Sequence, residues 1–199
     1  GFSIITWAGT GGVNTVGHGL NSAPELILIK GLSSAGDWQV YSSPTGNGNK
    51  LVINSFAAQS STTRWNSTSP TSSVFTLNDS GLGTNLVAYA FQSVAQYSSI
   101  GTYTGNSSDN GPIVETGFEP AFLIIKNTSD VGSWFMYDNK RNTSNPRINY
   151  LLANASNVEA SDMGGVDFLS NGFQIKDDHP DVNDTGDTYL YIAFAADPS

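Results

Sequence analysis

The sequence predicts an all-β protein, an antiparallel β-sandwich built from two tandem pseudo-repeats of roughly 100 residues that pack closely together. Three observations predict this fold. Short apolar and β-branched runs recur along the chain, loops rich in glycine and serine separate them, and one hairpin-sized stretch occurs twice. No convincing amphipathic helix longer than two turns is present, so we expect no helical layer.

The repeated stretch defines the two pseudo-repeats. It reads APELILIKGLSSAGDWQVY at 23–41 and EPAFLIIKNTSDVGSWFMY at 119–137, with Lys30 matched to Lys126 and no gap between the copies. Weaker matches, such as ITWAGT with GTYTGN and LVAYAF with LYIAF, extend the similarity over the chain. We therefore expect one pseudo-repeat at 1–95 and another at 96–199. No linker rich in proline, glycine or serine separates them, which favours closely packed halves over tandem domains.

The first strands of each pseudo-repeat follow from the repeated stretch. The runs at 25–30 and 122–126 are apolar on both faces, which is typical of strands covered on both sides. After a hairpin-like loop come DWQVY and SWFMY, and their repeated tryptophans, Trp38 and Trp134, are expected in the core.

Local signals place the later elements. The segment 166–176 contains Asn-Gly between apolar residues and predicts a β-hairpin. The segment 155–163 is expected to form one or two helical turns. The predicted sandwich therefore consists of short strands joined by polar loops.

Composition limits the partners of the protein. The net charge is −9, with eight Lys and Arg residues and 13% charged residues in total. Nucleic acid binding requires clustered basic residues, so nucleic acid and anionic membrane surfaces are not expected partners. The chain has no cysteine, which excludes disulfides and thiolate metal sites. It also has no apolar run of membrane-spanning length, so we expect no membrane insertion. We expect no cofactor either.

Acid–base chemistry has weak support in the sequence. The chain has two histidines, of which His18 lies between glycines and His179 lies in an acidic loop. We expect His18 to be a turn residue that bonds the backbone and His179 to be solvated. The four glutamates show no pairing of the kind that glycoside hydrolysis requires, and we predict no catalytic residue. These glutamates are Glu25, Glu115, Glu119 and Glu159.

The acidic segment KDDHPDVNDTGD at 176–187 is a weak calcium candidate. Its oxygen-bearing side chains resemble the first half of an EF-hand loop, but Ile192 stands where the bidentate glutamate belongs. A solvated hairpin loop is therefore favoured over a metal site. The candidate ligands are Asp177, Asp178, Asp181, Asn183 and Asp184.

Three aromatic residues are candidates for stacking on sugar rings. Trp65 lies in the polar stretch STTRWNSTSPTSS, and we add Tyr97 and Tyr103. Exposed aromatic rings beside polar side chains hold the apolar faces of sugars. A packed wedge at the sandwich edge is the favoured alternative for Trp65, and a structural role comes first for Tyr103.

The chain resembles a duplicated β domain of bacteriophage tail and virion structural proteins, notably of marine and cyanobacterial phages. The resemblance spans the chain in order, through TVGHGL, LILIK, GDWQVY, WNSTSPTSSVFTL, SIGTYTGN, GPIVETGFEPAFLIIK, DFLSNGF and TYLYIAFA. It implies a location on the virion surface and a structural or host-recognition role, and it brings no established site residues. The acidic DDHPDVND departs from the pattern and is a place to look for particle-specific function.

Three functions follow as expectations. The favoured one is a non-enzymatic virion protein of a tail fibre, tail or capsid surface. It associates with copies of itself, as a trimer in a fibre, and with other virion proteins. The alternative is a carbohydrate-binding module for host surface glycans, and a glycan depolymerase is the least favoured. The sequence leaves open whether the chain is part of a longer polypeptide.

Overall fold

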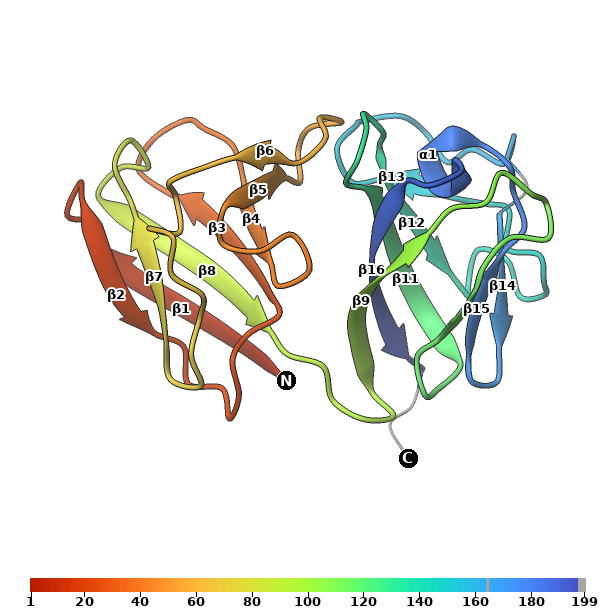
Figure 1. Cartoon of the computed structure of the whole chain (residues 1–199), viewed down its shortest axis with the longest axis horizontal. Helices are drawn as coiled ribbons and strands as arrows, with labels where there is room; N and C mark the ends of the chain where they lie inside the picture. The colour runs from red at the N-terminus through yellow and green to blue at the C-terminus, as the bar shows by residue number, and fades with distance from the viewer. Residues whose placement is uncertain (164, 197–199) are drawn as a thin grey trace. The chain divides into compact units, whose positions relative to one another are not determined.

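The computed structural model describes residues 1–163 and 165–196, and these residues form two compact units (Figure 1). Unit 1 comprises Gly1–Asn54 and Gln59–Gln92, and unit 2 comprises Ser55–Ala58 and the chain from Ser93 onward. The prediction of an all-β fold with antiparallel sheets packed as a sandwich is confirmed.

Unit 1 contains a larger sheet in the order β1-β8-β3-β4-β5-β6 and a smaller sheet of β2 and β7. All of its described pairings are antiparallel. Because successive side chains of a strand point to opposite faces, alternate residues of each strand face the core. The strands are β1 Phe2–Ala8, β2 Val13–Gly17, β3 Leu26–Gly31, β4 Gln39–Ser42, β5 Asn49–Val52, β6 Ser60–Ser61, β7 Val74–Asn78 and β8 Asn85–Phe91.

Unit 2 contains a five-stranded sheet in the order β13-β12-β11-β16-β9 and a smaller sheet in the order β10-β15-β14. The described part of the chain also has one short helix, α1 at Pro180–Asn183. The strands are β9 Ser98–Thr104, β10 Ile113–Glu115, β11 Pro120–Asn127, β12 Trp134–Asp138, β13 Leu151–Leu152, β14 Val166–Leu169, β15 Gly172–Ile175 and β16 Thr188–Ala195.

The two larger sheets pair their strands in the same register. Phe2 of β1 pairs with Phe91 of β8, and Ser98 of β9 pairs with Phe194 of β16. The loop contacts correspond as well. The backbone N–H of Trp38 donates to the side chain of Asn54 at 2.9 Å, and that of Trp134 donates to Asn154 at 2.8 Å. The β1–β8 pair of unit 1 and the β9–β16 pair of unit 2 are therefore separate ladders with matching register.

Each unit has its own hydrophobic core between its larger and smaller sheets. The core of unit 1 joins Ile27 and Ile29 of β3 with Phe75 and Leu77 of β7. The core of unit 2 is rich in tyrosine and phenylalanine and joins Leu123 and Ile125 of β11 with residues that include Tyr103, Tyr137, Phe173 and Tyr189. These alternating positions explain why the sequence pattern indicated strands.

Two local expectations were wrong. The segment 155–163 forms no helix, because Ala160 pairs with Tyr150 in an isolated antiparallel bridge. Trp134 is fully buried as expected, whereas Trp38 is half-buried and stacks on Tyr89 with 5.8 Å between the ring centroids. In unit 1 the core-facing aromatic of β4 is Tyr41 instead.

Candidate functional site

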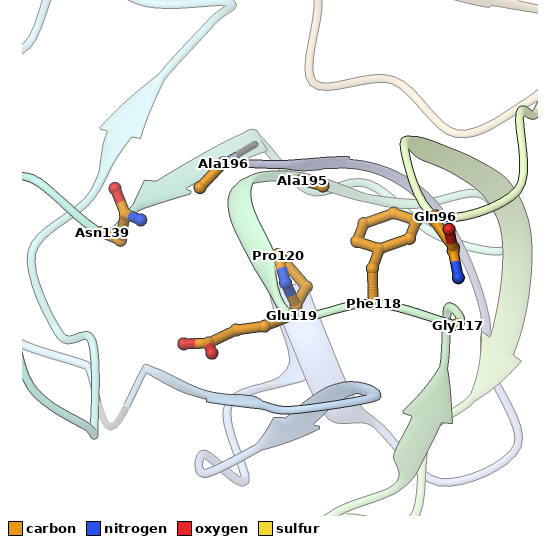
Figure 2. A pocket seen from close by; sticks show the side chains of 8 residues that line it. All are labelled: Gln96, Gly117, Phe118, Glu119, Pro120, Asn139, Ala195 and Ala196. Carbon is orange, nitrogen blue, oxygen red and sulfur yellow. The ribbon is translucent and has the colours of Figure 1, made fainter. Parts of the chain in front are cut away.

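A surface pocket of about 410 Å³ lies in unit 2, where several strands of the larger sheet begin or end. It lies at the start of β11, the end of β16, the turn before β9 and the residue after β12 (Figure 2). Eight residues line it, namely Gln96, Gly117, Phe118, Glu119, Pro120, Asn139, Ala195 and Ala196. We call it the Glu119 pocket.

Local backbone chemistry opens the sheet at this point. Pro120 pairs with Ala195, but Phe122 already pairs with Phe194, so Ala121 forms a bulge in β11. Proline has no N–H to give to the ladder, which makes it suitable for a strand start or a bulge. Gly117, with φ of +87°, turns the chain into the pocket wall. The sequence GFEP therefore forms the floor and one wall of the pocket.

Hydrogen bonds fix this wall from both sides. The hydroxyl of Thr116 donates to the carbonyl of Phe118 at 2.7 Å, and the N–H of Gly117 donates to the carbonyl of Asn171 at 3.3 Å. On the opposite side the N–H of Ala195 donates to the carbonyl of Tyr97 at 2.9 Å. The pocket is thus built on hydrogen-bonded backbone.

The side chains around the pocket combine an apolar surface with polar groups. In Figure 2 the ring of Phe118 lies between Pro120 and Gln96, and Glu119 extends away from that ring on the side where Asn139 lies. Glu119 and Gln96 are exposed, and Glu119 is the only titratable residue of the lining. One carboxylate and two amides suit a ligand that has hydroxyl groups, whereas the Phe118 ring is 7% exposed and packs in the core of unit 2.

Trp65 is not a stacking platform. Its side chain is 2% exposed, packs edge-on against Tyr41 at 5.5 Å between centroids, and donates its indole N–H to the carbonyl of Asn49 at 2.7 Å. The indole has a hydrogen-bond partner inside the protein, so the polar loop around it closes over the core of unit 1. The glycan role of Trp65 is therefore wrong, and the packed-wedge alternative describes it.

Tyr103 is buried as well, and Tyr97 is not. Tyr103 is 7% exposed, stacks on Tyr189 at 4.9 Å and donates its hydroxyl to the carbonyl of Val182 at 2.6 Å. Burial raises the pKa of Tyr103 well above its ordinary value. Tyr97 is 41% exposed and follows Gln96 directly in the chain. Of the three aromatic candidates, only Tyr97 remains available to a ligand.

The acidic segment folds into structure and not into a solvated hairpin loop. Asp177 is buried and accepts the N–H of His179 at 2.9 Å, and His179 in turn caps α1 by accepting the N–H of Asp181. Asn183 is fully buried, while Asp178 and Asp184 are exposed. Within residues 1–163 and 165–196, no group of three His, Cys, Asp or Glu side chains lies together, so the acidic segment does not gather its carboxylates around a metal.

His18 has the structural role that its sequence context indicated. It is 1% exposed, its Nδ1 accepts the N–H of Leu20 at 3.1 Å, and its Nε2 lies 3.0 Å from the carbonyl of Thr71. Nδ1 is therefore the acceptor and Nε2 the donor in this arrangement. Both ring nitrogens hold loop backbone, and neither faces a nucleophile or a carboxylate in the described contacts.

Sequence reasoning missed the pocket because its residues come from four separate segments. Phe118, Asn139 and Gln96 carry no motif, and Glu119 stood out only as one of four glutamates without a partner for hydrolysis. The one local signal was the positive-φ glycine followed by Phe-Glu-Pro at 117–120. That signal indicates a turn before a strand and says nothing about a cavity.

Comparison with known proteins gives one match. A family described as a domain of unknown function, DUF7483, matches residues 1–198. No curated protein and no solved structure matches the chain. In the described part of the chain, no helix has the length and apolar character that crossing a membrane would take.

Proposed function

We propose, from the premise that the chain belongs to the DUF7483 family, that it is a non-enzymatic structural protein of a bacteriophage virion. In this proposal it lies on the particle surface, in a tail fibre, a tail or the capsid surface, and contributes to host attachment. The resemblance of the sequence blocks to those of phage virion structural proteins, which spans the whole chain, supports the virion assignment. The Glu119 pocket supports the attachment role and is the observation that carries it.

Two features support assembly with further copies and with other virion proteins. The chain has few charged residues, which lowers the electrostatic cost of bringing identical surfaces together. Phe2 and Ile4 of the edge strand β1 are 52% and 62% exposed, and the ring of Phe2 lies 4.7 Å from that of Phe91. An edge strand with exposed apolar side chains is a surface that pairs readily with another chain.

The same proposal includes the two pseudo-repeats. Five strands of each larger sheet follow corresponding orders, and β6 is a sixth strand in unit 1. The corresponding orders and registers support a duplicated ancestor of roughly 100 residues per copy, which is the usual size of one sandwich domain. The smaller sheets differ by one strand, β14, which has no counterpart in unit 1.

A carbohydrate of the host surface is the ligand class that the Glu119 pocket fits. Pyranose rings have apolar faces that pack on an aromatic ring, and their hydroxyl groups donate to carboxylates and bond amides in both directions. Glu119 supplies the acceptor, and Asn139 and Gln96 supply the amides. The Phe118 ring is 7% exposed and belongs to the core of unit 2, so the exposed ring of Tyr97, which follows Gln96 in the chain, supplies the apolar contact.

A glycan array followed by calorimetry tests the attachment role. We expect the wild-type chain to bind a bacterial surface glycan, and the variants Glu119→Gln and Asn139→Ala to bind it at least about tenfold more weakly, since each loses a hydrogen bond to the ligand. Glu115→Gln is the matched control, because Glu115 is exposed on β10 and outside the pocket. Equal binding by Glu119→Gln and the wild type, or no bound glycan at all, would reject the role.

A further inference from the structure

Asp79 of unit 1 is a fully buried carboxylate with one unpaired oxygen. It directly follows β7, and its Oδ2 accepts the backbone N–H of Thr10 at 2.9 Å and the side-chain amide of Asn14. Its Oδ1 is covered by protein and has no hydrogen-bond partner among the described residues. A buried carboxylate costs several kcal/mol in general unless its charge is compensated, so this oxygen calls for a partner.

Asp79 forms part of a pocket of about 380 Å³ bounded by two glycine-rich loops. The oxygen acceptors converge there because glycine leaves them room. A Cβ at Gly9 would lie 2.4 Å from the carbonyl oxygen of Gly83 and 3.2 Å from Oδ2 of Asp79. The lining residues are Gly9, Thr10, Gly11, Asp79, Gly81, Gly83 and Thr84. Carboxylate, carbonyl and hydroxyl oxygens are the ligands that hard cations prefer.

Arg64 does not neutralise Asp79 by direct contact. Its guanidinium donates to the carbonyls of Asn78 and Ser80, on either side of Asp79, at 2.5 and 2.9 Å. In the described part of the chain these two residues form no ion pair. Arg64 therefore fixes the loop that holds the carboxylate, and its charge interacts with that of Asp79, but Oδ1 has no hydrogen-bond partner among the described residues.

In unit 2 the carboxylate at the corresponding position has hydrogen-bond partners on both oxygens. Asp177 corresponds to Asp79 by register, because the Val16–Phe75 and Val114–Phe173 pairs precede them equally. Both oxygens of Asp177 accept N–H groups, from His179 at 2.9 Å and from Gly165 at 3.4 Å.

The turn of α1 supplies the remaining groups in unit 2. Asn183 accepts the N–H of Asn106 at 2.9 Å, as Asp79 accepts that of Thr10, and it donates to the carbonyl of Asp177 at 2.7 Å. The loop after Asp79 is shorter and has no such turn. No described residue of unit 1 takes the place of these groups at Oδ1 of Asp79.

We propose that Asp79 and the oxygen atoms around it bind a divalent cation of the Ca²⁺ class in unit 1. The carboxylate of Asp79 is the charged ligand, carbonyl and threonine oxygens of the two loops are the neutral ones, and water completes the six to eight positions that Ca²⁺ takes. The cation compensates the buried charge and joins the loop after β1 to the loop after β7. This site is separate from the Glu119 pocket, which lies in unit 2.

Calorimetric titration of the EGTA-treated chain with CaCl₂ tests the proposal. We expect one Ca²⁺ per wild-type chain and a rise in the thermal unfolding midpoint on adding Ca²⁺, because a ligand that binds only the folded state stabilises it. Asp79→Asn should bind at least tenfold more weakly. Asp177→Asn is the matched control and should bind like the wild type.

A second variant keeps the test decisive if Asp79→Asn does not fold. Thr84→Val removes one hydroxyl at an exposed position of the pocket wall, and we expect at least threefold weaker binding. The proposal is overturned if the wild type binds no Ca²⁺. It is also overturned if Asp177→Asn, and neither Asp79→Asn nor Thr84→Val, loses binding, since the cation would then belong to the acidic segment.

Discussion

Lys126 of β11 is a buried amine in unit 2. It is 0% exposed, and its Nζ donates to the carbonyl of Gly132 at 2.7 Å and to that of Phe56 at 3.3 Å. Burial lowers the pKa of Lys126 to about 8, although the nearby Asp181 and Asp130 favour the charged form. Lys30 makes the corresponding bond to Gly36 in unit 1 and is only half-buried. The repeated lysine thus connects each β-strand to the loop that follows it.

The lowered pKa of Lys126 predicts a stability that rises with pH. Above pH 8 the folded state has released this proton, while the unfolded state holds it up to the ordinary pKa of 10.5. The folding equilibrium therefore shifts toward the folded state by up to about 1.4 kcal/mol per pH unit between pH 8 and 10. Urea unfolding of the wild type and Lys126→Met checks this. The unfolding free energy of the wild type minus that of the variant should rise from pH 8 to pH 10. A constant difference would contradict the lowered pKa.

At the scale of the element, the β14–β15 hairpin depends on a close approach between β15 and its other neighbour, β10. Gly172 begins β15, the central strand of the smaller sheet, and a Cβ there would lie 2.0 Å from the carbonyl oxygen of Val114 on β10. The sequence predicted this hairpin from Asn171-Gly172. The third strand, β10, is three residues long and gave no signal that it would pair with β15.

Gly172→Ala should therefore destabilise unit 2. We expect a loss of about 2–3 kcal/mol in unfolding free energy, because the added methyl group meets backbone that cannot move without breaking the β10–β15 ladder. Gly36→Ala is the matched control, since nothing lies within 4 Å of its Cβ position and its φ is not positive. Thermal unfolding of both variants gives the comparison, and equal midpoints would show that β10 yields to the methyl group.

The strands could be predicted from the sequence because their signals are local. The runs in β3 and β11, the repeat between them and the Asn-Gly hairpin each depend on residues within one short stretch. The sites could not be predicted in this way. The Glu119 pocket joins the turn before β9 to the ends of β12 and β16, and the Asp79 oxygens meet Gly9 across 70 positions of chain. Burial determined which aromatic candidates could contact a ligand. The burial of Trp65 depends on Tyr41 and Asn49, which are not its neighbours in sequence.

Self-association is the central claim for the whole molecule, because the proposed role in a virion requires assembly with further copies. The exposed Phe2 and Ile4 on the edge strand β1 place one candidate contact between copies in unit 1. Ile4→Lys adds a charge to that edge and should weaken the association. Val158→Lys is the matched control and should associate like the wild type, because Val158 is 87% exposed and lies outside the strands.

The most direct test is the mass of the purified chain in solution, measured by light scattering coupled to size exclusion. We predict a stable oligomer with a mass that is a whole multiple of 21.0 kDa, with a trimer as the expected form, and dissociation of that oligomer in Ile4→Lys. A monomer of 21.0 kDa at every concentration tested would contradict the claim, and the chain would then be an independent binding module.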